Sequence, residues 1–126
     1  MRGSILYGAL RSALGALMLS RPIARIEFPR HGRRFMITCE ADRGNWVISA
    51  PRRRFAVLHD IDIGDEVVVA MPSGEIVRYR VRSIRVVKQN NTAILQDFGD
   101  RRLTMMTGYP FDETGDLRYA VVAISK

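Results

Sequence analysis

The 126-residue sequence contains a single cysteine, Cys39, only two histidines and one tryptophan. One cysteine cannot form an intrachain disulfide, so the fold must be stable without such a crosslink. His31 and His59 show no CxxC or HxxxH spacing around them, and we therefore expect neither a metal site nor a cofactor. A long apolar run is also absent. The most apolar segment, residues 4–20, is interrupted by Arg11 and falls short of the roughly 18 uninterrupted residues expected of a membrane-spanning helix.

Residues 4–20 nevertheless carry leucines at helical spacing and are followed by Pro22, which ends helices. We therefore predict an N-terminal helical or apolar segment over residues 1–21 and a single folded domain over residues 22–126. Three roles for the segment remain open. It could pack on the domain, lie on a membrane surface, or be a signal-like segment that is cleaved.

The composition is that of a folded protein, with 47% apolar and 26% charged residues, and the net charge is +7. Such a charge can attract nucleic acid, anionic lipid or acidic polymers. The arginines gather in Arg52–Arg54 and at alternate positions of residues 78–82. Binding of single-stranded nucleic acid would need aromatic side chains on the same face, but Tyr79 alternates with the arginines of its strand and only Phe55 adjoins the first run. We expect most of these arginines to be solvated, and nucleic acid is not the expected partner.

Short runs with alternating apolar residues, separated by turn residues, predict about eight strands. The longest is Glu75–Lys88, whose alternation slips by one residue at Ser83 and so predicts a bulge. Thr92–Leu95 is expected to be a short strand between two turns, and Arg54–Asp60 a helical turn. The predicted fold is all-β: a closed barrel of about eight strands, with an N-terminal helix and one short helix between strands.

The most specific pattern lies near the C-terminus, where residues 102–111 read RLTMMTGYPF and residues 117–122 read LRYAVV. This pattern resembles the signature of the sortases, cysteine transpeptidases that cut a sorting signal and join it to an amine. In that family a strand close to LTLxTCYPF ends on the nucleophilic cysteine, and the next strand begins with an arginine. Gly108 stands at the position of the cysteine, and Arg118 stands at the position of the arginine. The resemblance is greatest to the sortases of Gram-negative bacteria.

Three further segments resemble the family in the right order, namely residues 24–30, 43–50 and 55–66. The resemblance therefore covers about residues 22–126 and implies a sortase-like eight-stranded barrel. Counting back from Gly64, the family's GHRD motif falls on residues 49–52, so that Ala50 stands at the position of the catalytic histidine. In addition, only four residues separate Cys39 from Gly44, where the family usually has a loop and a helix.

These departures predict a pseudoenzyme rather than an active enzyme. Cysteine transpeptidation needs a thiolate and a proton donor that act together, and Gly108 and Ala50 supply neither. The resemblance implies that the groove is retained, so we expect an extended peptide or a segment like a sorting signal to bind near Arg118, Thr107, Gly108 and Tyr109. It also implies the bacterial cell envelope, on the extracytoplasmic face of the membrane, with possible membrane contact through residues 4–20.

Other interpretations remain open. The guanidinium of Arg118 could bind a ligand's carboxylate or carbonyl, or it could pair with an acidic residue of the preceding loop; the candidates are Asp112, Glu113 and Asp116. An active or cryptic transpeptidase would need a different nucleophile or base, such as Cys39, Thr107 or His59. Glu40 beside Cys39 would raise the pKa of the thiol, which argues against that choice. A third class is a basic barrel that binds nucleic acid or anionic membrane.

Overall fold

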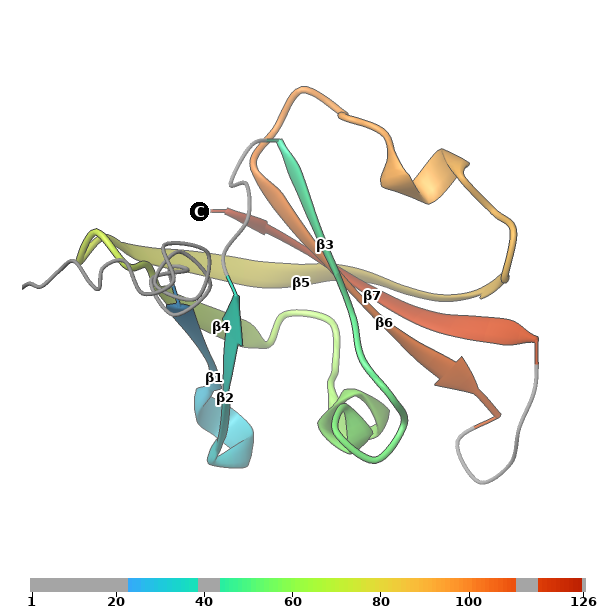
Figure 1. Ribbon diagram of the computed structural model, residues 1–126, viewed down its shortest axis with the longest axis horizontal. Helices are drawn as coiled ribbons and strands as arrows, with labels where there is room; N and C mark the ends of the chain where they lie inside the picture. The colour runs from blue at the N-terminus through green and yellow to red at the C-terminus, as the bar shows by residue number, and fades with distance from the viewer. Residues whose placement is uncertain (1–22, 39–43, 111–115, 126) are drawn as a thin grey trace, which may run out of the picture.

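The computed structural model describes residues 23–38, 44–110 and 116–125, which form seven strands and three short 3-10 helices (Figure 1). The strands are β1 (Ile23–Phe28), β2 (Arg33–Thr38), β3 (Asn45–Ser49), β4 (Glu66–Ala70), β5 (Ile76–Lys88), β6 (Arg102–Tyr109) and β7 (Leu117–Ser125). The 3-10 helices are η1 (Pro29–His31), η2 (Ala56–Asp60) and η3 (Ala93–Leu95). The helix expected over residues 4–20 lies outside the described residues, within which no helix is long and apolar enough to cross a membrane.

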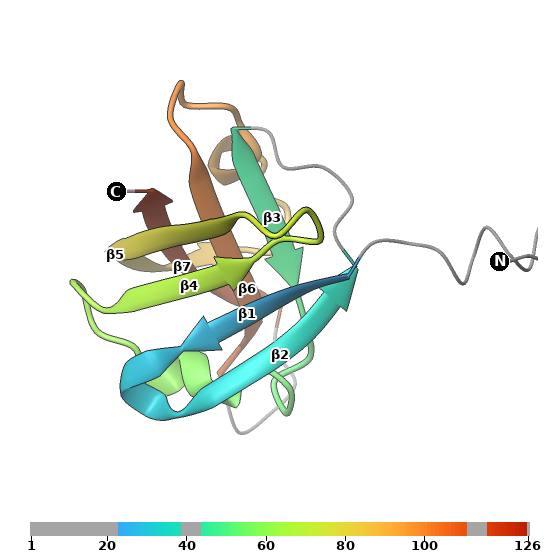
Figure 2. The ribbon, with the colours of Figure 1, turned by 90° about the vertical axis from the view of Figure 1, so that its left-hand side faces the viewer.

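All seven strands belong to one sheet in the order β2-β1-β4-β5-β7-β6-β3. Every neighbouring pair is antiparallel except β3 and β6, which are parallel. The sheet curls, with β1, β2 and β4 facing β3, β6 and β7 across the core (Figure 2). Within the described part of the chain, the end strands β2 and β3 are not hydrogen-bonded to each other. The all-β prediction is therefore confirmed, whereas closure into an eight-stranded barrel is not observed.

The expected eighth strand, Thr92–Leu95, is instead the site of η3, which begins at Ala93. The side chain of Asn91 accepts a hydrogen bond from the backbone N–H of Ala93 at 2.9 Å, and this turn starts the chain on a helical path. A four-residue apolar run cannot distinguish a strand from a single helical turn, because both bury such residues. The short helix predicted over Arg54–Asp60 is present as η2.

The predicted bulge in β5 is also present. The pairing of β5 with β7 shifts between Val81 and Ser83, so one extra residue is inserted into β5. Before the shift, Val77, Tyr79 and Val81 are buried in the main core; beyond it, Val87 belongs to a second cluster. The bulge lets one long strand follow the curl of the sheet.

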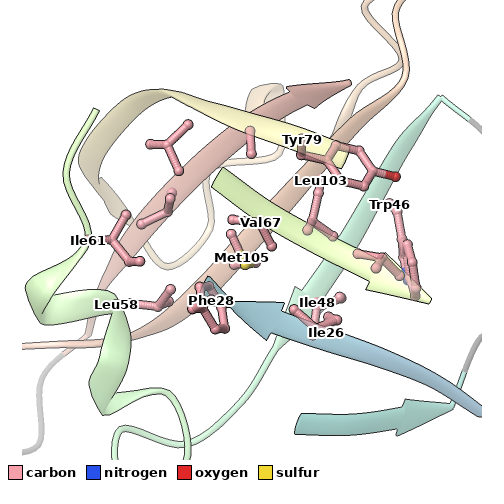
Figure 3. Packing of buried hydrophobic residues seen from close by; sticks show 14 of the residues in the cluster. Ile26, Phe28, Trp46, Ile48, Leu58, Ile61, Val67, Tyr79, Leu103 and Met105 are labelled. Atoms are coloured by element: carbon pink, nitrogen blue, oxygen red, sulfur yellow. The ribbon is translucent and has the colours of Figure 1, made fainter. Parts of the chain in front are cut away.

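The main core fills the inside of the curl (Figure 3). Its largest fully buried side chains include Tyr79, Phe28, Phe55 and Leu58, and burial of each apolar side chain contributes about 1.5–3 kcal/mol. A smaller cluster lies on the other face of the sheet and comprises Val87, Ile94, Ala120 and Val122, with Met106 packed against it. The strands β6 and β7 are thus covered on both faces, which holds their relative position firmly.

Asp65 connects the turn after η2 to the turn at η1. It accepts hydrogen bonds from the backbone N–H of Asp62 and from His31, each at 3.0 Å, and forms an ion pair with Arg30 at 3.2 Å. Burial opposes ionisation of this carboxyl group, but the hydrogen bonds from Asp62 and His31 and the positive charge of Arg30 together lower the pKa of Asp65 below 3.8. The carboxylate is therefore ionised at neutral pH and stabilises the junction of the two turns.

We expect Asp65→Asn to lower the free energy of unfolding by about 1–3 kcal/mol at pH 6. Because the pKa of Asp65 is lowered on folding, its contribution is complete well above the unfolded-state pKa, from about pH 5, and is lost as the pH falls through the folded-state pKa. Urea unfolding at pH 6 and at pH 3 should therefore show a smaller difference between wild type and variant at pH 3. Asp60→Asn, at an exposed position of η2, is the matched control and should change little. An equal loss at both pH values would show that the charge is not involved.

Candidate functional site

The structure places Gly108 of β6 directly opposite Arg118 of β7. Residues that face each other across an antiparallel pair direct their side chains to the same face of the sheet. This face also carries Met106 and Ala120, which belong to or pack against the smaller cluster. Gly108 corresponds to the nucleophile of the resembling family and Arg118 to its arginine. The two residues are thus side by side, although they lie ten positions apart in the sequence.

Ala50 joins them from the end of β3. Its backbone N–H donates to the carbonyl oxygen of Met106 at 3.1 Å, which extends the contact between β3 and β6 by one residue. Beyond Ala50 the chain leaves the sheet and forms the wall of a cleft of about 400 Å³. The cleft is lined by Ser49, Ala50, Pro51, Arg52, Met106, Thr107, Gly108 and Arg118. All three positions assigned by resemblance therefore border one cleft.

Arg52 enters this cleft in a way that the sequence did not predict. Its Nε donates to the carbonyl oxygen of Pro110 at 2.6 Å, and the guanidinium lies over Gly108. A Cβ atom added to Gly108 would be 2.6 Å from Cζ of Arg52 and 2.7 and 2.8 Å from its two Nη atoms. The guanidinium therefore fills the space that a cysteine side chain would need. A glycine inside a strand often marks the close approach of another group. Gly108 within β6 was therefore the one feature of the sequence that could have indicated this contact.

Thr107 and Tyr109 were expected to bind ligand, but the pleat of β6 directs their side chains to the face opposite that of Gly108. Thr107 borders the cleft, yet its side chain is buried with 2% exposure. Tyr109 stacks on Tyr119 with ring centroids 5.8 Å apart. Burial raises the pKa of Tyr119, and Tyr109 and Asp62 raise it further, so this phenol stays protonated. Neither predicted side chain points into the cleft beside Arg118.

A family model of the sortase domain matches residues 27–125 of this chain. The chain belongs to the sortase family. The family membership predicted from the two C-terminal motifs is thereby confirmed, and the match includes all seven strands except the first residues of β1.

Solved sortase structures share the fold. Sortase A from Corynebacterium diphtheriae aligns with a TM-score of 0.73 and 23% identity, covering 85% of this chain and 62% of that one. Sortase A from Listeria monocytogenes gives 0.74 and 14%, with 85% and 88% covered. Sortase C from Clostridium perfringens, solved with the C-terminal cell wall sorting motif, gives 0.71 and 17%, with 81% and 69% covered. A comparison with curated protein sequences gives no match.

Within the described part of this sortase chain, the cleft contains no thiol and no imidazole. His31 pairs with Asp65 at 3.0 Å, and His59 lies on η2; neither lines the cleft. Cys39 lies outside the described residues. Among the residues placed by the structure, no three His, Cys, Asp or Glu side chains gather as a metal site would require. The chemistry that the cleft offers is that of two guanidinium groups, Arg52 and Arg118.

A second concavity, of about 640 Å³, lies between the two ends of the sheet. It is lined by the last residues of β2, by residues 45–50, and by Arg54 and Phe55. Arg54 donates to the carbonyl oxygen of Met36 at 2.7 Å and so links the turn after β3 to β2. The shortened connection noted in the sequence, between Cys39 and Gly44, lies outside the described residues.

Two of the arginines of β5 contact protein groups. Arg78 pairs with Glu66 at 3.2 Å, and Arg80 donates to the carbonyl oxygen of Gly64 at 2.8 Å. Tyr79 lies between them in sequence but is fully buried on the inner face. The absence of nucleic acid as a partner stays a prediction, and this row of arginines offers no stacking surface for it.

Proposed function

We propose that this member of the sortase family is a pseudoenzyme that binds an extended peptide, or a segment like a sorting signal, in the cleft beside Arg118. The observation that carries the proposal is the placement of Gly108, which faces Arg118 and is covered by the guanidinium of Arg52. A peptide that binds there meets donors of hydrogen bonds but no nucleophile, so it is held without being cut.

Three features support peptide binding. Met106, Ala50 and Pro51 give the cleft apolar walls. Arg118 donates from Nη1 to the carbonyl oxygen of Leu117 at 3.1 Å, and its other N–H groups have no hydrogen-bond partner among the described residues, so they can donate to a ligand. Finally, the related sortase C from Clostridium perfringens has been solved with a C-terminal cell wall sorting motif, so this fold accommodates a peptide of that kind.

We expect Arg118→Ala to weaken binding of a fluorescent peptide library by at least about tenfold, because a hydrogen bond from a charged donor contributes about 1.5–3 kcal/mol. Fluorescence anisotropy measures the affinity. Arg53→Ala is the matched control, since Arg53 is exposed, lies in the same basic run and does not line the cleft. If peptides bind equally well to wild type and to Arg118→Ala, the cleft is not their site.

We place the protein at the bacterial cell envelope, on the extracytoplasmic face of the membrane, on the ground of family membership alone. Residues 4–20 are the proposed membrane-contacting segment. Fractionation of cells that produce the full chain, and of cells that produce residues 22–126, measures this directly. Recovery of the full chain only with cytoplasmic proteins would contradict the proposal.

A further inference from the structure

Two positively charged residues, Arg52 and Arg118, line the same cleft. Arg118 is the direct cross-strand neighbour of Gly108, and the guanidinium of Arg52 lies within van der Waals distance above Gly108. They come from separate elements, since Arg52 follows β3 and Arg118 is the second residue of β7. An anion bound in this cleft would be attracted by both guanidinium groups.

The hydrogen bonds of these arginines are incomplete. Arg52 is half-buried and donates from Nε to Pro110, but its Nη2 atom is fully buried and has no hydrogen-bond partner among the described residues. A buried donor without a partner is costly, and more so when it is charged. Arg118 donates only to Leu117 within the same part of the chain. Apart from the buried Nη2 of Arg52, the remaining N–H groups of the two arginines take their acceptors from solvent or from a ligand.

No carboxylate of the described residues lies within 4 Å of either guanidinium, Asp116 included. Five other arginines do have such partners: Arg25 with Glu27, Arg30 with Asp62 and Asp65, Arg78 with Glu66, Arg101 with Glu75, and Arg102 with Asp100. No acid of the described residues neutralises the two arginines that line the cleft, so their charge is available to an anionic ligand.

We infer that the cleft recognises an oxyanion, namely the free C-terminal carboxylate of the bound peptide, between Arg52 and Arg118. This inference rests on the proposed peptide-binding function. A carboxylate accepts several hydrogen bonds and matches the planar fork of a guanidinium. The position of Arg52 also favours a chain end over an internal residue. Its guanidinium covers Gly108 and is fixed to Pro110, so it closes the path along β6, and a peptide must end or turn there.

The direct test uses nuclear magnetic resonance of the arginine side chains. We expect N-acetylglycine to shift the Nε–H resonances of Arg52 and Arg118, whereas N-acetylglycine amide, which has the same shape without the carboxylate, should not shift them. The exposed Arg53 serves as an internal control and should not respond to either. If the acid and the amide have the same effect, or neither has any, the inference is wrong. A response to inorganic phosphate but not to N-acetylglycine would identify a phosphate site and would also overturn it.

A second test uses library peptides synthesised as free acids and as C-terminal amides. Wild type should bind the acids at least about tenfold more tightly, since the charged hydrogen bonds are lost in the amides. Arg52→Gln should remove this preference, whereas Arg53→Gln should keep it. Tighter binding of peptides that carry an internal aspartate and an amidated end would overturn the assignment to a chain end.

The two proposals fail in different ways. If library peptides bind and Arg118→Ala weakens them, but acids and amides bind equally, peptide binding stands and carboxylate recognition is wrong. If N-acetylglycine binds between the arginines but no library peptide does, carboxylate recognition stands and the proposed peptide function is wrong. Circular dichroism and thermal unfolding of Arg52→Gln confirm that the variant is folded before either comparison is made.

Discussion

The triple variant Gly108→Cys, Ala50→His, Arg52→Ala is expected to cleave peptides and to transfer them to an added amine, whereas the wild type yields no product. The first two substitutions supply the thiol and the imidazole that sortase chemistry requires, and loss of either group from a covalent enzyme typically costs several orders of magnitude in rate. The third is needed because a Cβ at position 108 would lie 2.6 Å from Cζ of Arg52. Mass spectrometry of peptide and amine incubated with each variant measures the product.

The double variant that keeps Arg52 is the informative comparison. Its new cysteine must displace the guanidinium of Arg52 from Pro110. A misplacement of about 1 Å in an active site can reduce the reaction rate about 10²-fold. We therefore expect the double variant to form product at least about 10²-fold more slowly than the triple variant. The double variant combined with Arg53→Ala removes the same charge from the same segment and should behave like the double variant. Equal rates with and without Arg52 would show that this side chain does not obstruct the cleft.

Product from the wild type that is lost in Cys39→Ala would instead establish an active transpeptidase.

Phe55→Ala is expected to produce the largest loss of stability, about 3–5 kcal/mol, because a fully buried aromatic side chain is replaced by a methyl group. Phe55 is 1% exposed and packs edge-to-face on Phe35, whose ring in turn packs on Phe28. Its backbone N–H also donates to the carbonyl oxygen of Pro51, which fixes the turn that carries Arg52. Peptide affinity should therefore fall together with stability. Urea unfolding measures the first effect, and fluorescence anisotropy the second.

Phe98→Ala is the matched control. Phe98 is 49% exposed and its ring lies 4.2 Å from the guanidinium carbon of Arg102, a contact that contributes about 0.5–1 kcal/mol. Peptide affinity should not change, because Phe98 does not line the cleft. If Phe98→Ala destabilises the protein as much as Phe55→Ala does, the core inside the curl is not the main source of stability.

The alternation in β5 shows what could be predicted from local sequence. A strand has a period of two residues, so the apolar positions Val77, Tyr79 and Val81 had to share a face, and the slip at Ser83 had to appear as a bulge. The C-terminal motifs likewise predicted the neighbouring positions of Gly108 and Arg118. Both predictions depend on residues within one strand or one strand pair, where the pattern of the sequence determines the outcome.

The roles of Thr107 and Tyr109 as binding residues stay a prediction. The period of a strand directs their side chains to the face opposite that of Gly108, which proximity in the sequence did not indicate. Arg52 was missed for a different reason. It lies 56 positions before Gly108, and only the parallel pairing of β3 with β6 brings the turn after β3 over that glycine. Such a contact depends on the order of the strands, which a single sequence does not reveal.

The strand order has a mechanical consequence. β2 and β3 lie at opposite ends of the hydrogen-bonded order, yet they are consecutive in the chain, with Thr38 and Asn45 only seven positions apart. Seven residues span at most about 25 Å, so Thr38 and Asn45 cannot separate by more than this, whichever hydrogen bonds of the sheet are broken. The covalent connection therefore limits how far one end of β2 can move from the adjoining end of β3, although no hydrogen bond joins the two strands within the described residues.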